Sequence, residues 1–442
     1  MAGAAPVAGN SVRLLRDGAE NYPAWLDAIG AARNVIDFEN YIVRNDATGR
    51  QFAAALADKA RQGVQVRVLY DWLGCIGTPR AFWRALREAG AEVRCFNRPR
   101  LDSPLFWLSR NHRKSLRCDG VGFVAGLCVG DVWTERPGHP AWRDTGIELR
   151  GPAVADIAAA FAQSWAHAGG GRPGPDVADS APEKLGTISL RVIGSRPNTM
   201  GLYRFDQLIA GIARHTLWLT DAYFVGTTAY VQTLCDAARD GVDVRLLVPG
   251  ASDLPVAKAL SRAGYRPLLE AGCRVFEWDG PMLHAKTAVA DGRWARIGSS
   301  NLNIASWMGN WELDVAVEDE GFAGAMQDMF RADLDHATEI LLDLGRVEAV
   351  DDRPARRGSP GRLTAGAVGL GSAVGAALTN RRALGPAESK VMAAGGTILL
   401  VVAGVAVFWP LVLTLPVAVM AAWVALTLLV RAWRLRRHRR AG

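Results

Sequence analysis

Short apolar runs alternate with segments of helical periodicity along the first 350 residues, and the whole pattern occurs twice. Short apolar runs bounded by turn residues are typical of buried strands. The pattern therefore predicts an internal repeat with three such strands in each copy. The matching runs are AARNVIDFENYIV (31–43) and GIARHTLWLTDAYFV (211–225), GVQVRVLYDW (63–72) and GVDVRLLVPG (241–250), and AGAEVRCF (89–96) and AGCRVFEW (271–278).

The segments between these runs carry apolar residues at helical spacing, as in QFAAALADKARQ (51–62) and YVQTLCDAARD (230–240). The order strand, helix, strand, helix, strand predicts an α/β fold. We expect two pseudo-symmetric α/β sandwich halves that pack around a pseudo-two-fold axis. Tyr41 and Tyr223 occupy equivalent positions in the two copies.

Composition marks the limits of these halves. AGGGRPGPDVADSAPEKLG (168–186) and DDRPARRGSPGR (351–362) are polar and aperiodic, which is typical of linkers. The expected organisation is a first half at 1–167, a linker at 168–186, a second half at 187–350 and a second linker at 351–390. The second linker contains an uncharged glycine-rich run at 363–378 that either lies at a membrane interface or serves as a tether.

Residues 391–430 contain no charged side chain and are interrupted by FWPLVLTLP. Since one membrane crossing needs about 20 apolar residues, the stretch predicts two transmembrane helices joined by a Pro-containing turn. Basic residues flank it on both sides, so the positive-inside rule places both ends in the cytoplasm and the N-terminal body on the cytoplasmic face of the inner membrane. The alternative is a buried helical hairpin in a soluble core. No secretory signal is visible in 1–9.

Most of the net charge of +7 comes from the C-terminal tail. The predicted cytoplasmic tail, 431–442, holds six arginines and no acid, so residues 1–430 carry 7 − 6 = +1. A near-neutral body argues against nucleic acid as a partner. The six cysteines form no C-x-x-C pair, which favours reduced thiols and argues against a structural zinc site. Nothing in the sequence indicates an oligomeric state.

One short motif, His-x-Lys-x4-Asp, occurs once in each half at equivalent points of the repeat. The chain has only seven histidines, so two matches placed in this way are not expected by chance. The two copies are His112, Lys114 and Asp119 in NHRKSLRCDG, and His284, Lys286 and Asp291 in HAKTAVAD, 172 residues later.

Strand geometry assigns parts to these residues. Residues i and i+2 of a strand face the same side, so each histidine and its lysine can point together into one pocket. The aspartates, seven residues after each histidine, suit structural orientation better than contact with substrate. Asp144 and Glu312 follow His112 and His284 by 32 and 28 residues and can fix the imidazole tautomer. The alternative for each is an ordinary carboxylate at a strand edge.

Two imidazoles and two ammonium groups that converge on a symmetry axis suit displacement at a phosphodiester. One histidine would attack phosphorus while the other protonates the departing alkoxide. The lysines, with Ser299, Ser300 and Asn301 of the GSSN sequence, would stabilise charge on the non-bridging oxygens. No acidic cluster with metal-ligand spacing accompanies the histidines, so we expect neither a metal nor another cofactor.

Together these residues resemble the phospholipase D superfamily. The resemblance rests on the doubled HxKxxxxD motif, GSSN, the N-x-E of Asn310 and Glu312, and WRD followed by RGPAV (150–154). Within the superfamily the chain is most similar to bacterial cardiolipin synthases, over roughly residues 11–345. The resemblance implies transfer of a phosphatidyl group between two phosphatidylglycerol molecules, with release of glycerol. It places both His-Lys-Asp sets in the active site, with His112 as nucleophile and His284 as general acid; the reverse assignment is open.

The first copy departs from the family pattern. Ala125 and Cys128 stand where the family has glycine and asparagine, and the turn after Asp119 is one residue shorter. Asn303 replaces a common aspartate, and the predicted hairpin lies at the C-terminus rather than the N-terminus. The acceptor therefore stays open, because a hydrolytic phospholipase D or a transferase to another alcohol shares the same intermediate. A nuclease is disfavoured by the near-neutral body, and a non-enzymatic membrane scaffold by the completeness of both motifs.

Overall fold

The computed structural model describes residues 4–99, 109–171 and 183–342, together with isolated helical residues between Phe408 and Leu429. Met1–Phe96 and Arg110–Ala377 belong to one compact unit, and Asn97–Ser109 and Leu378–Gly442 to a second. Most of the predicted linkers, the predicted hairpin and the basic tail lie outside the described residues. No helix among the described residues is long and apolar enough to cross a membrane, so the C-terminal hairpin stays a prediction.

The first half contains seven strands and four α-helices in its described part. In chain order these are β1 (Val7–Arg16), α1 (Asp17–Ala31), β2 (Val35–Asn40), α2 (Ala47–Arg61), β3 (Gln65–Asp71), α3 (Arg80–Glu88), β4 (Glu92–Phe96), β5 (Ser115–Cys118), β6 (Val121–Ala125), β7 (Thr145–Arg150) and α4 (Val154–His167). A 3-10 helix, Asp131–Trp133, precedes β7.

The second half repeats this order and adds a helix and a strand. Its described elements are β8 (Ile188–Ser195), α5 (Gly201–Ile212), β9 (Thr216–Thr220), α6 (Thr228–Arg239), β10 (Asp243–Pro249), α7 (Pro255–Ala263), α8 (Tyr265–Glu270), β11 (Arg274–Trp278), β12 (Thr287–Ala290), β13 (Trp294–Gly298), β14 (Glu312–Glu318), α9 (Glu320–Leu334) and β15 (Ala337–Ile340). A π-helix, Ala305–Gly309, precedes β14.

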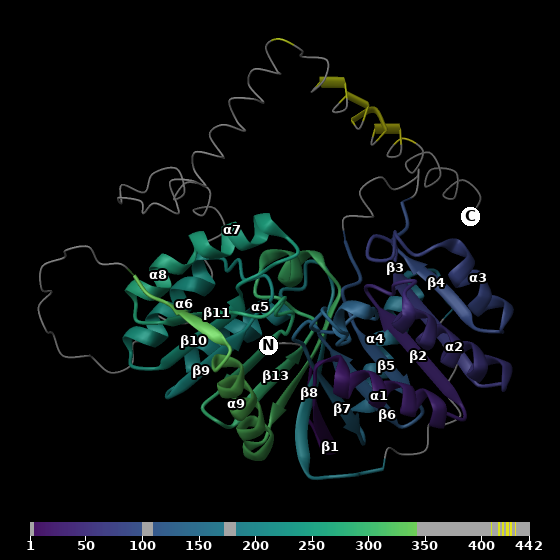
Figure 1. The fold of residues 1–442 in the computed structure, drawn as a ribbon, viewed down its shortest axis with the longest axis horizontal. Helices are drawn as coiled ribbons and strands as arrows, with labels where there is room; N and C mark the ends of the chain where they lie inside the picture. The colour runs from purple at the N-terminus through teal and green to yellow at the C-terminus, as the bar shows by residue number, and fades with distance from the viewer. Residues whose placement is uncertain are drawn as a thin grey trace, which may run out of the picture. The chain divides into compact units, whose positions relative to one another are not determined.

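All strands of the described ranges form one mixed sheet in the order β15-β11-β10-β9-β12-β13-β14-β8-β1-β7-β6-β5-β2-β3-β4. The antiparallel pair β1–β8 lies at its centre (Figure 1), and the same strand order runs outward from this pair in both directions. In each half three strands are parallel, as the predicted strand and helix order requires. The pseudo-two-fold axis therefore passes between β1 and β8, two strands that the sequence pattern did not predict.

The sheet folds back on itself at this axis. Strands β6 and β7 of the first half pack against β13 and β14 of the second, and α4 and α9 complete the layer. Ile147, Leu313 and Met326 are fully buried in this shared core. Burial of each such side chain contributes roughly 1.5–3 kcal/mol, which fixes the two halves against each other.

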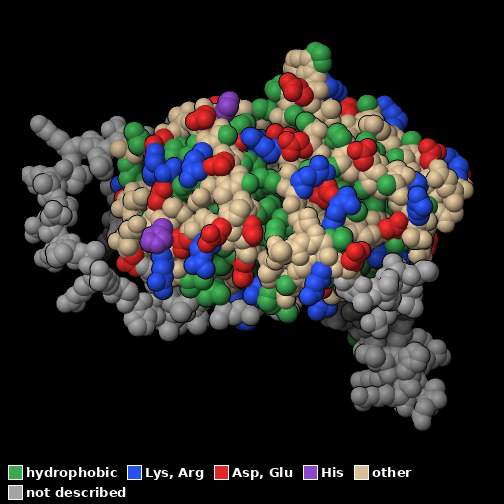
Figure 2. Space-filling view, turned by 90° about the horizontal axis from the view of Figure 1, so that it is seen from below, with side chains coloured by type: hydrophobic (Ala, Val, Ile, Leu, Met, Phe, Trp, Pro, Cys, Tyr) green, Lys and Arg blue, Asp and Glu red, His purple; other side chains and the backbone are tan. Residues whose placement is uncertain are grey.

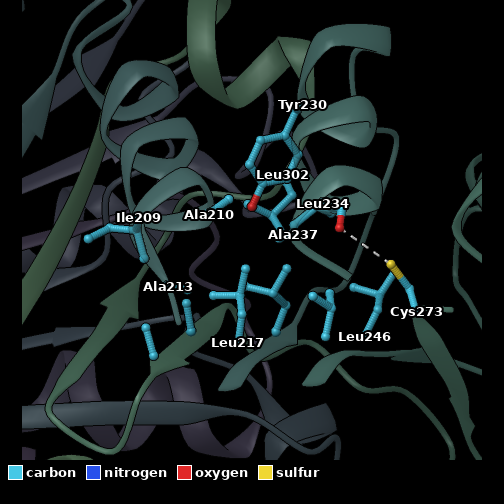
Figure 3. Close-up of a cluster of buried hydrophobic side chains, with 14 of the residues drawn as sticks. Ile209, Ala210, Ala213, Leu217, Tyr230, Leu234, Ala237, Leu246, Cys273 and Leu302 are labelled. Atoms are coloured by element: carbon cyan, nitrogen blue, oxygen red, sulfur yellow. Dashed lines mark hydrogen bonds between the residues drawn. The ribbon is translucent and has the colours of Figure 1, made fainter. Parts of the chain in front are cut away.

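Each half also has a core of its own on the outer face of its parallel strands. In the second half, Leu234 of α6 packs with Leu217 of β9 and Leu246 of β10, as Figure 3 shows. Side-chain caps fix where several helices begin, since Asp46 accepts from Gly49 N before α2 and Thr227 accepts from Tyr230 N before α6. Helices thus cover one side of the parallel strands. The carboxyl ends of these strands stay uncovered and can form a site.

Candidate active site

Backbone pairing at the pseudo-two-fold axis brings the two motifs together. His112 N donates to Trp311 O at 2.9 Å, and His284 N donates to Arg143 O at 2.7 Å. Trp311 and Arg143 are the residues directly before Glu312 and Asp144. Each motif is therefore held beside the carboxylate that belongs to the opposite half.

The imidazole and carboxylate pairs are accordingly crossed. His112 Nδ1 lies 2.9 Å from Glu312 Oε2, and His284 Nδ1 lies 2.7 Å from Asp144 Oδ2. Distance along the chain associates Asp144 with His112 and Glu312 with His284, whereas the structure joins each histidine to the other carboxylate. Both pairs are buried, so the hydrogen bonds are not weakened by competing solvent.

Each carboxylate is held by further donors. Asp144 Oδ2 accepts from Trp133 Nε1 at 3.0 Å and Oδ1 from Thr145 N at 2.9 Å. Glu312 Oε2 accepts from Ser299 Oγ at 2.5 Å, and Oε1 accepts from Asn310 Nδ2 at 3.3 Å. These hydrogen bonds compensate burial of the carboxylates and orient them toward the imidazoles.

Electrostatics define the resting protonation state. Burial lowers the pKa of His112, and burial together with the Lys286 ammonium lowers the pKa of His284 to about 3. Burial alone would raise the pKa of Asp144 and Glu312, but the neighbouring imidazoles and lysines lower both. At neutral pH each imidazole is therefore neutral, donates Nδ1–H to its carboxylate and carries its free electron pair on Nε2.

Each motif lysine is hydrogen-bonded to the backbone of its own motif histidine. Lys114 Nζ donates to His112 O at 2.6 Å, and Lys286 Nζ donates to His284 O. The ammonium groups lie 5.2 Å and 5.8 Å from the ring centroids of Tyr41 and Tyr223, within the range of cation–π attraction. Burial lowers the pKa of both lysines.

The prediction that each histidine and lysine lie within a strand is wrong. β5 begins at Ser115 and β12 begins at Thr287, one residue after the motif lysine in each half. The histidine amides pair with the opposite half, whereas the carbonyls of Lys114 and Lys286 still accept from Ala125 N and Gly298 N of the neighbouring strands. Each lysine ammonium nevertheless donates a hydrogen bond to the backbone carbonyl of the histidine in its own motif.

The motif aspartates are not brought to the histidines. Asp119 accepts hydrogen bonds from the backbone amides of residues 33–35, and Asp291 from those of residues 214–216. Both have positive φ, +49° and +53°, at the turns after β5 and β12. They fasten these turns to the starts of β2 and β9, which agrees with structural orientation and not with substrate contact.

Asp291→Ala is expected to lower the free energy of unfolding by about 1–2 kcal/mol, because three backbone donors lose a charged acceptor and alanine strains a positive φ. Asp291→Asn is the matched control, since asparagine tolerates this backbone and keeps one acceptor. The backbone amides outweigh burial and lower the pKa of Asp291, so the stability difference between wild type and Asp291→Asn is full at neutral pH and fades as acidity protonates the carboxylate. Urea unfolding measures both effects. A large loss of turnover per folded molecule, with stability unchanged, would contradict this role.

Both histidines face one pocket of about 670 Å³. Of the predicted GSSN donors, only Asn301 lines it, because Ser299 is bound to Glu312 and Ser300 is fully buried with its amide on Asp314. Sequence reasoning missed several pocket residues, although the repeat equivalence of the two tyrosines was a signal. The missed residues are Tyr41, Arg44, Trp133, Trp142 and Tyr223.

The first half supplies fewer donors, and the register explains why. Ser115 pairs with Val124 as Thr287 pairs with Ile297, so Gly126 is equivalent to Ser299 and Cys128 to Asn301. A Cβ at Gly126 would lie 2.1 Å from Asp144 Oδ1. The aspartate therefore occupies the space that a serine would need, which makes the two sides of the pocket chemically unequal.

Among the described residues, no cluster of three or more His, Cys, Asp or Glu side chains is arranged to hold a metal ion.

Two imidazole and carboxylate pairs on a doubled α/β scaffold define the class of phospholipase D-like proteins. Residues 208–334 match a family model described as "Cardiolipin synthase, PLD-like domain". Cardiolipin synthase A of Pseudomonas aeruginosa (strain LESB58) is 36% identical over 365 residues, which cover 80% of this chain and 74% of the relative. Cardiolipin synthase A of Pseudomonas entomophila (strain L48) is 33% identical over 365 residues, 80% of this chain and 75% of the relative. The chain belongs to the cardiolipin synthase family of phospholipase D-like phosphatidyltransferases.

Solved structures share the fold at low sequence identity. Phosphatidylserine synthase of Haemophilus influenzae Rd KW20 aligns with a TM-score of 0.59 at 14% identity, covering 74% of this chain and 87% of that protein. Polyphosphate kinase of Porphyromonas gingivalis aligns with a TM-score of 0.52 at 15% identity, covering 78% and 51%. At these identities the likeness concerns the arrangement of the sheet and helices alone.

Proposed function

We propose that this enzyme transfers a phosphatidyl group from one phosphatidylglycerol molecule to a glycerol hydroxyl of a second, giving cardiolipin and free glycerol. The observation that carries the proposal is the crossed pairing. It leaves two histidine Nε2 atoms free on a single pocket, each imidazole oriented by its own buried carboxylate. Family membership supports the substrate class.

In the first step, Nε2 of the nucleophilic histidine attacks phosphorus. A P–N bond forms, the P–O bond to the headgroup glycerol breaks, and the second histidine gives its Nε2 proton to the departing alkoxide. We assign His112 as nucleophile and His284 as acid. The phosphate anion of the arriving lipid raises the pKa of the imidazole beside it, so that His284 takes up a proton from solvent on Nε2 before the attack.

In the second step, the now neutral His284 takes the proton of an acceptor hydroxyl, whose oxygen attacks phosphorus as the P–N bond breaks. The buried ammonium groups of Lys114 and Lys286 and the side chain of Asn301 stabilise negative charge on the non-bridging oxygens. The unequal donor sets of the two halves favour binding of those oxygens toward the second half.

The test separates transfer from hydrolysis. The purified full chain is incubated with phosphatidylglycerol labelled in its headgroup, and the lipid and water-soluble products are resolved. We expect cardiolipin and free glycerol in equal amounts. Phosphatidic acid without cardiolipin would instead establish a hydrolytic phospholipase D, and a mixed product with an added alcohol would establish a different acceptor.

Membrane attachment belongs to the same proposal. We propose that residues 391–430 form a two-helix hairpin, with the basic tail 431–442 and the catalytic body both on the cytoplasmic face of the inner membrane. Such an anchor would keep the pocket close to its lipid substrate.

A further inference from the structure

Exposed apolar side chains gather at the mouth of the pocket. Leu254, Leu260 and Ile304 line the pocket, yet they are 52%, 48% and 52% exposed. Leu254 directly precedes α7, Leu260 lies within α7, and Ile304 directly precedes the π-helix. A cluster of half-exposed branched side chains around one opening is unlike the scattered single apolar residues of an ordinary protein surface.

The equivalent loop of the first half has the same character. Leu73 and Ile76, 37% and 66% exposed, lie between β3 and α3, at the place that corresponds to the β10–α7 connection. Cys75, which lies between them, accepts a hydrogen bond on Sγ from Val43 N. The two residues before Val43, Tyr41 and Ile42, line the pocket. Because β3 and β10 end at the sheet edge where the pocket opens, apolar side chains stand on both sides of it.

Charged side chains of both signs surround these apolar residues. Arg84 pairs with Glu88, Arg262 with Glu277 and Arg266 with Glu270. Arg44 and Asp253 both line the pocket. The face seen from below in Figure 2 likewise carries basic and acidic side chains interspersed. The mouth of the pocket is therefore distinguished by its half-exposed apolar side chains and not by a net charge, and such side chains beside the pocket of a phosphatidyltransferase suit contact with the hydrocarbon of a bilayer.

We propose that this apolar rim (Leu73, Ile76, Leu254, Leu260 and Ile304) docks directly onto a phospholipid bilayer. The lipid headgroup would rise into the pocket while its acyl chains stay in the bilayer, so that no methylene has to be moved into water. This inference rests on the proposed function for the identity of the lipid. The docking itself is separate from catalysis and from the predicted hairpin.

The experiment uses the full chain reconstituted in vesicles of phosphatidylglycerol and phosphatidylcholine. The native cysteines are buried or half-buried, so Ile76→Cys can be labelled with a polarity-sensitive fluorophore. Ile212→Cys is the matched control, since Ile212 is 53% exposed and lies just before β9, at the opposite edge of the sheet. We expect nitroxide-labelled acyl chains to quench the fluorophore at 76 by about half and the one at 212 hardly at all.

A kinetic measurement follows the same surface. We compare the rate on bilayer phosphatidylglycerol with the rate on monomeric short-chain phosphatidylglycerol. Ile76→Ser is expected to lower this ratio by about tenfold, because one apolar side chain no longer contributes its burial free energy to bilayer binding. Ile212→Ser should leave this ratio unchanged.

Equal quenching at 76 and 212, or an unchanged rate ratio in Ile76→Ser, would overturn the inference. A blue shift at 76 in detergent that grows with protein concentration would also overturn it and assign the rim to a second copy of the chain. Failure of the proposed function would look different, because quenching would persist while no cardiolipin is formed.

Discussion

The variants His112→Ala and His284→Ala are each expected to lose phosphatidyl transfer by about 10⁴-fold or more, because one removes the atom that bonds to phosphorus and the other the proton donor to the leaving group. The loss should appear in kcat, since the pocket walls that would bind the lipid remain. His139→Ala is the control, because His139 is exposed in the loop before the WRD sequence. Steady-state assays on phosphatidylglycerol measure all three variants.

The covalent intermediate tells the two histidines apart. Lipid labelled with ³²P is mixed with enzyme and the reaction is stopped in neutral denaturant, since a P–N bond is labile in acid and stable in base. With His112 as nucleophile, label forms on wild type and, more slowly because the leaving group lacks its proton, on His284→Ala, but never on His112→Ala. The opposite distribution would exchange the two roles, and an acid-stable label, or none in any variant, would argue against histidine as nucleophile.

The sequence was sufficient for the three parallel strands of each half and the helices between them, because apolar runs and helical spacing repeat in both halves. It did not reveal β1 and β8, whose residues mix polar and small side chains with apolar ones and are only partly buried. Local pattern identifies strands with a buried face, but a strand at a junction between halves depends on a partner about 180 residues away.

The chemical residues were found by type and spacing, but their pairing was not. His112 and Asp144 belong to one half and are close in sequence, which favours a pair between them. The backbone bond from His112 N to Trp311 O instead brings Glu312 to His112. Which carboxylate reaches which imidazole depends on how the halves dock, and no spacing within one half contains that information.

Ser299 shows the same limit on a smaller scale. Its type suggests a phosphate donor, whereas the fold uses Ser299 to hold Glu312. For Asp119 and Asp291 the spacing from the histidines already favoured a structural part, and both close turns. A polar residue beside a catalytic group can serve either the substrate or the scaffold, and only its hydrogen-bond partners decide between the two.

The crossed pairs lead to the second large effect. Glu312→Gln and Asp144→Asn are each expected to lower kcat by about 10²–10⁴-fold, because an amide can hold the wrong imidazole tautomer and does not stabilise the imidazolium. The two losses should differ in kind. We expect Glu312→Gln to impair His112, the proposed nucleophile, and Asp144→Asn to impair His284, the proposed acid, although each carboxylate lies in the other half.

A lipid with a p-nitrophenol headgroup makes this difference visible, since such a leaving group departs without a proton. His284→Ala and Asp144→Asn should then release a burst of p-nitrophenol close to that of wild type, while His112→Ala and Glu312→Gln stay slow. If Asp144→Asn instead behaves like His112→Ala, each carboxylate serves the histidine of its own half during catalysis. Both carboxylates are equally buried, and each is held by two further donors, so a folding defect would affect Asp144→Asn and Glu312→Gln alike. A p-nitrophenol burst that returns in Asp144→Asn but not in Glu312→Gln therefore reports the crossed pairing and not misfolding.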